Sequence, residues 1–233
     1  MTIHLYELCG ATEDHLFSPH CWKTRMSLAH KGLDFASAPV PFIKVASVEG
    51  GDSRKVPVIR DGDEVIEESY EIAKYLEQAY PDKPSLFNGD GGEALTAFVI
   101  SWATTQIHPA VAKLCVYDIH NALAPEDQAF FRTSREKLFG CTLEEFDAKF
   151  PKNGEALEAA LFPLKNLLSR QPYLGGASPV FADYVVFGPL QWLCTTCKHD
   201  HLPKEGPVAD WFHRLLDLYD GMGRNTKLAS QSN

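Results

Sequence analysis

The sequence lacks any run of about 18 unbroken apolar residues, which a membrane-spanning helix would require. Its first eight residues, Met-Thr-Ile-His-Leu-Tyr-Glu-Leu, have neither the basic start nor the long apolar stretch of a secretory leader. We therefore expect a soluble protein that stays in the cytoplasm and does not bind a membrane.

Cysteine and basic residues are also scarce. Six irregularly spaced cysteines in 233 residues argue against a disulfide scaffold, so we expect free thiols. The 22 Lys and Arg against 31 Asp and Glu give a net charge of −9, and no Lys and Arg cluster is interleaved with aromatic residues. Such a charge repels phosphate backbones, so we expect no nucleic-acid partner.

One segment contains the residue types that bind zinc: Cys194, Cys197, His199 and His201. Zinc-binding histidines usually stand three to five residues apart, and these two do not. The cysteines also fit the end of a helix, where the cationic Lys198 would be favourable. We expect no metal site.

What the sequence does have is enough apolar material, 45% of its residues, for one large core or two modest ones. Proline and glycine concentrate between residues 80 and 92, which indicates a connection between domains. We expect a first domain at residues 1–84, a linker at 85–92, a second domain at 93–223 and a polar tail at 224–233.

The two parts differ in their hydrophobic patterns. The first alternates short β-rich runs with helical ones, which predicts a small α/β sheet covered by helices. Its expected strands are residues 3–8, 34–40, 56–60 and 64–67, and its expected helices are residues 18–31 and 72–79. The second part is helical throughout. The apolar stripe of Leu157, Leu161, Leu164 and Leu168 predicts a buried helix face.

The first chemically informative motif is Ser18-Pro19-His20-Cys21, where the first helix should begin. Cys-Pro-x-Cys at this place in a thioredoxin-like fold is a thiol redox site, and here Ser18 occupies the attacking position. A serine hydroxyl can donate a hydrogen bond to a thiolate, and the helix N-terminus favours the same ion. A free thiol, with a pKa of ~8.5, needs such help at neutral pH. The alternative is that Ser18 is only a helix cap. Tyr6 is a weaker candidate for the same role, and we expect Cys21 to be a small buried side chain.

The second motif is Val56-Pro57 at the head of a predicted strand. A proline there is unusual unless its peptide bond is cis or the strand lies at an edge. A cis bond would leave the backbone of Val56 free to pair with an extended peptide. A simple turn proline is an equal alternative.

The third motif is Glu68-Ser69 at the start of a helix. The Ser69 hydroxyl and nearby N–H groups suit a carboxylate, while Glu68 suits an ammonium, so together they would hold an α-amino acid head group. Ordinary helix capping remains the alternative.

These motifs occur in order and, with Phe181-Ala182-Asp183-Tyr184, make the sequence resemble the glutathione transferase family. The resemblance implies an α/β thioredoxin-like N-terminal domain, an all-α C-terminal domain, glutathione as cosubstrate and a homodimer. It also implies that Ser18 contacts the glutathione sulfur. Val56 and Pro57 would then bind the cysteinyl backbone, and Glu68 and Ser69 the γ-glutamyl end.

Within that family, residues 17–25, 28–32 and 173–176 are similar to β-etherase-like transferases of bacteria and fungi. This implies that the glutathione thiolate displaces an aryloxide from a β-aryl ether. A non-catalytic protein that carries hydrophobic aromatic ligands is the alternative. For the aromatic substrate we expect a pocket lined by Trp102, Tyr117 and Trp192, with Phe139 and Tyr184 as further candidates.

Two departures from the family pattern lead to further expectations. Val180 stands three residues before Asp183, where the family usually has Ser or Thr, so half of a capping box is missing. We expect the helix to compensate by starting earlier, at Ser178-Pro179. The connection from Cys9 to Phe17 is long, and we expect it to shape the entrance to the active site.

Overall fold

The computed structural model describes residues 2–51 and 55–228. The first half contains a four-stranded mixed sheet in the order β2-β1-β3-β4. Strands β1 (Ile3–Leu8) and β2 (Phe35–Val40) are parallel, whereas β3 (Val58–Asp61) is antiparallel to both β1 and β4 (Glu64–Glu67). The α/β fold predicted for this half is confirmed.

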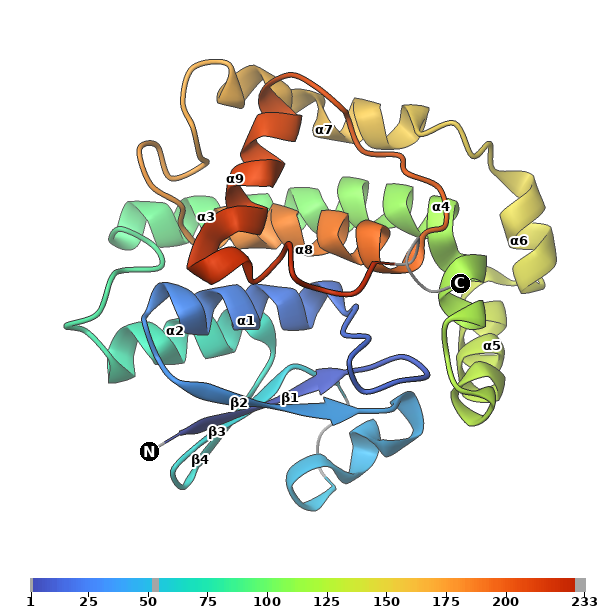
Figure 1. Cartoon of the computed structure of the whole chain (residues 1–233), viewed down its shortest axis with the longest axis horizontal. Helices are drawn as coiled ribbons and strands as arrows, with labels where there is room; N and C mark the ends of the chain where they lie inside the picture. Colours follow the sequence, from blue (N-terminus) through green and yellow to red (C-terminus); the bar gives the residue numbers. More distant parts are fainter. Residues whose placement is uncertain (1, 52–54, 229–233) are drawn as a thin grey trace.

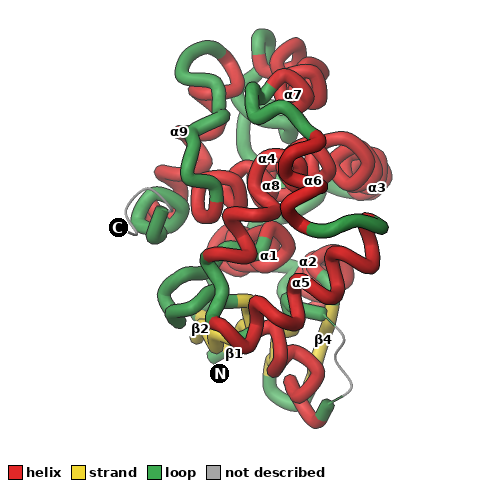
Figure 2. The backbone as a smooth tube through the Cα atoms, turned by 90° about the vertical axis from the view of Figure 1, so that its right-hand side faces the viewer, coloured by secondary structure: helices red, strands yellow, loops and turns green. Residues whose placement is uncertain are grey.

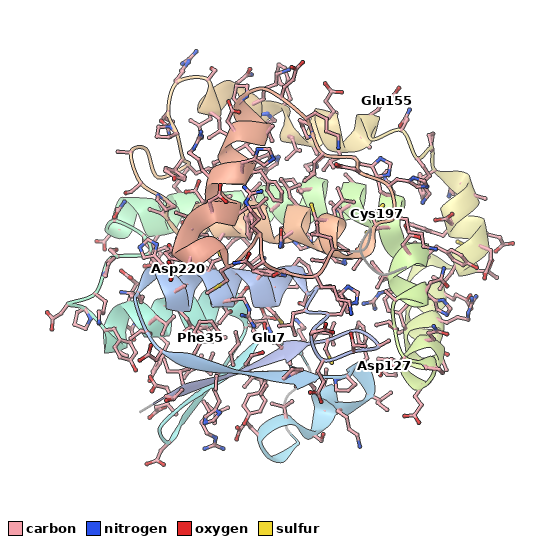
Figure 3. The ribbon with its side chains drawn as sticks, in the orientation of Figure 1. Glu7, Phe35, Asp127, Glu155, Cys197 and Asp220 are labelled. Carbon is pink, nitrogen blue, oxygen red and sulfur yellow. The ribbon has the colours of Figure 1, made fainter. Side chains whose placement is uncertain are left out.

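Helices α1 (Pro19–His30) and α2 (Ser69–Ala79) cover one face of this sheet (Figure 1). The carboxylate of Glu7, which is only 1% exposed, ties β1 to α1 by an ion pair with Arg25 (Figure 3). It also accepts a hydrogen bond of 2.5 Å from the Ser37 hydroxyl on β2. A buried carboxylate needs such partners, so this network fixes where α1 lies on the sheet.

The second half is all helical, as predicted (Figure 2). Its elements are α3 (Asp90–Trp102), the π-helical turn η2 (Ala103–Ile107), α4 (His108–Asn121), α5 (Pro125–Phe139), α6 (Leu143–Lys149), α7 (Glu155–Leu168), α8 (Phe181–Thr196) and α9 (Pro207–Gly221). The leucine stripe of α7 is buried. In the part of the chain that the structure describes, no helix is long and apolar enough to span a membrane.

Helix α8 joins the two halves, because it is buried along most of its length and packs against both α1 and α4. Figures 1 and 2 both place α1 between the sheet and α8. The two helices come close at Gly188, where an added Cβ would lie 2.2 Å from the Pro19 carbonyl oxygen. Only glycine allows the two backbones to come this near at the start of α1.

The start of α8 differs from the expectation of an earlier beginning at Ser178-Pro179, since the helix begins at Phe181. The carboxylate of Asp183 takes over the capping. It accepts hydrogen bonds from the backbone N–H groups of Val180 (3.0 Å) and Leu174 (2.8 Å) and from the Trp211 indole (2.8 Å). The first helical N–H, that of Phe181, donates a hydrogen bond of 2.7 Å to the Leu86 carbonyl, so the helix needs no earlier turn to satisfy it.

Ion pairs hold the C-terminal segment against both halves as far as residue 227. Arg224 forms one with Asp217 of α9, and Lys227 forms one with Asp14 of the first half at 3.3 Å. The remainder of the predicted polar tail, residues 229–233, lies outside the described residues.

Candidate functional site

A cavity of about 950 Å³ lies between the two halves. It is lined by residues of α1, α2 and the loops of the first half, and by residues of α3, η2, α4, α5 and α8. Four of the predicted binding residues, Ser18, Val56, Glu68 and Ser69, line it together.

Ser18 is the N-cap of α1. Its Oγ accepts a hydrogen bond of 3.3 Å from the backbone N–H of Cys21, and the residue is 5% exposed. Because Oγ acts there as an acceptor, its own proton is available for a group in the cavity. Capping and thiol binding are therefore compatible roles for this residue rather than exclusive ones.

The Val56–Pro57 peptide bond is cis. Val56 lines the cavity, whereas Pro57 is buried behind it and does not. The Pro57 carbonyl accepts a hydrogen bond of 3.3 Å from the N–H of Glu68. This bond places the second and third sequence motifs side by side.

Glu68 precedes α2 with a φ of 69°, in the left-handed region that non-glycine residues rarely adopt. Such a conformation persists only where the surroundings hold it, and it is frequent at ligand sites. The Glu68 carboxylate forms an exposed ion pair of 3.1 Å with Lys55, which also lines the cavity. The buried Ser69 is the first residue of the helix.

The helical wall is a stripe of every fourth residue, which continues from α3 through the π turn η2 into α4. Its members are Ile100, Thr104, His108, Ala112 and Val116. Of the predicted aromatic pocket, Trp192 on α8 lines the cavity and so does Phe139 on α5.

Trp102 and Tyr117 do not line the cavity, in contrast to the sequence expectation. Each is one or two positions away from a stripe residue, and one residue turns a helix by about 100°, so both point elsewhere. Tyr117 stacks on His120 with ring centroids 6.1 Å apart. Tyr184 also lies outside the lining; its hydroxyl contacts His30 Nδ1 at 2.6 Å.

The connection from Cys9 to Phe17 also differs from expectation, because none of residues 9–16 lines this cavity. The loop packs instead against the end of α8, where His15 Nε2 lies 2.7 Å from the Thr195 carbonyl oxygen. The Trp22 indole of α1 donates a hydrogen bond of 3.1 Å to the Leu16 carbonyl and holds the loop down.

A cluster of nitrogen bases, which sequence reasoning missed, lines the cavity beside Ser18. Lys23 Nζ lies 3.2 Å from His20 Nδ1, and the His20 ring stacks on His108 with centroids 5.1 Å apart. Burial lowers the pKa of Lys23 to about 8 and that of His108 to about 3. Only the three-residue spacing of His20 and Lys23 was visible in the sequence, because His108 is remote along the chain.

Two hydrogen bonds connect the two halves across the cavity. Asp127, in the first turn of α5, accepts hydrogen bonds from the backbone N–H groups of Phe42 (3.1 Å) and Ile43 (3.0 Å), which begin the 3-10 segment η1 (Phe42–Gly50) (Figure 3). Both Phe42 and Ile43 line the cavity. Helix α5 and η1 are therefore fixed to each other across it.

The cysteines of the segment that resembled a zinc site are protonated thiols. Burial raises the pKa of Cys194 to about 12 and that of Cys197 to about 11. Among the described residues, no group of three or more His, Cys, Asp and Glu is arranged to hold a metal ion.

Comparison with known proteins gives matches over most of the chain. Residues 14–84 match the N-terminal domain of glutathione S-transferases, and residues 94–215 match their C-terminal domain. Glutathione S-transferase Z1 of Arabidopsis thaliana is 39% identical over 70 residues, and the match spans 28% of this chain and only 31% of that protein.

Two fungal crystal structures match nearly the whole fold. A glutathione S-transferase of Ceriporiopsis subvermispora in complex with glutathione is 25% identical, with a TM-score of 0.81, over 94% of this chain and 98% of that one. A glutathione transferase from Phanerochaete chrysosporium is 24% identical, with a TM-score of 0.79, over 95% and 97% of the two chains. With both domain models matched in order along one chain, this protein belongs to the glutathione S-transferase family.

Proposed function

We propose that the protein is a glutathione transferase that ionises the glutathione thiol beside Ser18 and directs it at an aromatic electrophile. The observation that carries this proposal is the placement of the Ser18 hydroxyl, at the N-terminus of α1, in a cavity that also contains Val56, Glu68 and Ser69. A thiolate at that position gains a charge-assisted hydrogen bond and the favourable field of the helix.

In this proposal, the glutathione tripeptide lies along the wall that the first half contributes to the cavity. The backbone of Val56, which lines the cavity, pairs with the cysteinyl residue, as an added strand does. Glu68 takes the α-ammonium of the γ-glutamyl end, and Ser69 with the first N–H groups of α2 takes its carboxylate. Glutathione bound to the fungal relative from Ceriporiopsis subvermispora supports the choice of this tripeptide.

The acceptor occupies the helical side of the cavity. Phe131 and Phe139 of α5 and Trp192 of α8 give that side an aromatic character, which suits a flat, apolar electrophile. A β-aryl ether is the acceptor class proposed here. The thiolate attacks the carbon that carries the aryloxide, an S–C bond forms, and the C–O bond breaks with its electron pair on oxygen.

The test uses glutathione and a fluorogenic β-aryl ether with native protein and with Ser18→Ala. We expect glutathione-dependent release of the fluorescent phenol and a thioether of matching mass. In Ser18→Ala we expect a loss in kcat of about 100-fold, typical of removing one donor to a developing or stabilised anion.

The ultraviolet absorbance of bound thiolate against pH provides a second readout. We expect a lower thiol pKa in the native protein than in Ser18→Ala. Equal thiol pKa values would contradict activation by serine. Conjugation of 1-chloro-2,4-dinitrobenzene without ether cleavage would support a general glutathione transferase and contradict β-etherase activity. Binding of both ligands without any turnover would favour the carrier protein.

A homodimer is also part of the proposal. Helix α3 exposes two large apolar side chains three positions apart, Leu95 (57% exposed) and Phe98 (69% exposed), which a second copy of the chain would cover. Sedimentation velocity at micromolar concentration checks this, and a monomer would contradict it.

A further inference from the structure

Lys23 is a buried cation without an anionic partner. It is 4% exposed, and the only hydrogen-bond contact of its Nζ among the described residues is His20 Nδ1 at 3.2 Å. No carboxylate of the described residues lies within ion-pair distance of it. Burying a lysine in this way destabilises a fold, and an apolar side chain of similar length would fill the same space at lower cost. Packing alone does not account for a lysine here.

The ammonium group lies at the end of α1 that carries Ser18. Side chains of a helix tilt toward its N-terminus, and the contact with His20, three residues earlier, shows that Lys23 follows this rule. All three residues line the cavity. The lysine nitrogen is therefore directed toward the first turn of α1, where the proposed function puts the glutathione sulfur.

The same end of the cavity contains polar atoms that lack partners. His108 Nε2 and Trp192 Nε1 are buried, and neither has a hydrogen-bond partner among the described residues. Both residues line the cavity with Lys23. Unpaired buried polar atoms are rare in folded proteins, so their presence at this end points to a polar ligand group there.

The titratable and charged groups that line the cavity with Lys23 come from several elements. They are His20 on α1, Lys55 in the loop before β3, Glu68 before α2, His108 on α4 and Arg135 on α5. Burial lowers the pKa of Lys23 to about 8, and the charge of Glu68 opposes this shift. Desolvation inside the cavity lowers the pKa of His20, which is open to the cavity, and of the half-buried His108, so both imidazoles are neutral near pH 7. Lys23 therefore changes its charge in the pH range in which a thiol ionises.

We propose that Lys23 is the proton carrier of the reaction, an inference that rests on the proposed function. Its neutral amine accepts the proton of the glutathione thiol, so the S–H bond breaks and a thiolate forms beside an ammonium. The thiolate sulfur bonds to the acceptor carbon as the aryloxide leaves with the electron pair of the C–O bond. The ammonium returns its proton to the aryloxide oxygen, which releases a phenol and restores the amine. His20 is the positioning residue for the lysine nitrogen.

Two substitutions at residue 23 distinguish the effect of the lysine's positive charge from its ability to accept a proton. Lys23→Met removes both, so we expect the pKa of the bound thiol, read from its ultraviolet absorbance, to rise by about one unit or more. Lys23→Arg keeps a permanent charge but cannot accept a proton. In this variant we expect a thiol pKa close to the native value. Calorimetry of Lys23→Arg near pH 8.5, in two buffers of different ionisation enthalpy, should show that this variant releases more protons per glutathione bound than native protein does.

Controls distinguish this inference from the function on which it rests. Lys165→Met, at an exposed position of α7, should change none of these readings. The thermal midpoint of Lys23→Met should equal or exceed that of native protein, because a buried charge has been removed. An unchanged thiol pKa in Lys23→Met, or equal proton release in Lys23→Arg, overturns the role of Lys23 alone. Failure of the native protein to bind glutathione overturns the proposed function.

Discussion

At the scale of single residues, a hydroxyl group accompanies a cationic side chain on each of two sides of the cavity. Ser18 and Lys23 lie on the α1 side, and Arg135 lies on the α5 side. The Arg135 guanidinium is 4.9 Å from the centre of the Phe131 ring and donates a hydrogen bond of 2.8 Å to the Ser134 hydroxyl. Among the described residues it has no carboxylate partner.

This arrangement predicts that an aromatic acceptor with a carboxylate is preferred over its neutral ester. We expect 4-chloro-3-nitrobenzoate to be conjugated with a higher kcat/KM than its methyl ester, and Arg135→Gln to lower that value about tenfold for the acid only. Steady-state kinetics with both acceptors measure the preference. Arg132→Gln is the matched control, because Arg132 is on the same helix but paired with Glu136 and Glu144.

A different outcome would assign Arg135 to the tripeptide instead. If Arg135→Gln weakened glutathione binding in calorimetry and lowered kcat/KM equally for the acid and the ester, the prediction about the acceptor would be wrong.

At the scale of elements, the close packing of α8 on α1 determines where the thiol-binding hydroxyl lies. An added methyl group at Gly188 meets backbone atoms of Pro19 rather than a flexible side chain. Gly188→Ala must therefore displace the start of α1, and Ser18 with it. We expect a loss of about 1–3 kcal/mol in the free energy of unfolding and a raised pKa of the bound thiol.

Urea denaturation and the absorbance of bound thiolate measure these two effects. Gly91→Ala is the control, since an added Cβ at Gly91 meets nothing within 4 Å and alanine is the better helix former. That variant should be as stable as the native protein or more so. A Gly188→Ala protein with native stability and native thiol pKa would show that the contact is not restrictive.

Most elements were predictable from the sequence because their signals are local. The alternation in residues 3–8, the Asp61-Gly62 turn and the leucine stripe of α7 each specify one structure within a few residues. Ser18 was identifiable as the α1 cap for the same reason.

The lining of the helical wall was not predictable from local signals. Aromatic residues are common both in the core and in pockets, so the sequence around Trp102 and Tyr117 did not show whether they line the cavity. The stacking of His108 on His20 joins residues 88 positions apart, and only the tertiary fold brings them together. The π turn at Ala103–Ile107 has no recognisable sequence signal of its own.

At the scale of the whole molecule, histidines that are shielded from bulk water make stability depend on pH. Desolvation lowers the pKa of five of them: the buried His15, the half-buried His30, His108 and His201, and His20, whose surface faces the cavity. The unfolded chain, with ordinary histidine pKa values near 6.5, then binds more protons than the folded one. The free energy of unfolding therefore falls as the pH decreases below about 6.5.

Urea denaturation at pH 7 and pH 5 should show this loss. His108, with a pKa of about 3, would remain neutral in the folded protein over that whole range. Each histidine that stays neutral in the folded protein lowers the free energy of unfolding by at most about 1.4 kcal/mol for each pH unit below 6.5. Between pH 7 and pH 5, we expect the free energy of unfolding of His108→Phe to fall by up to about 2 kcal/mol less than that of native protein. An equal loss in both proteins would mean that His108 is protonated in the folded state.

The π turn between α3 and α4 has a consequence for how relatives of this protein diverge. In a uniform α-helix, every fourth residue advances by about 40° around the axis, so a long stripe of such residues turns away from a flat wall. The wider turn at Ala103–Ile107 offsets part of that drift and keeps Ile100 and Val116 on one cavity face. Deleting one residue there would rotate everything downstream. A single deletion is thus a short evolutionary route to a new acceptor preference.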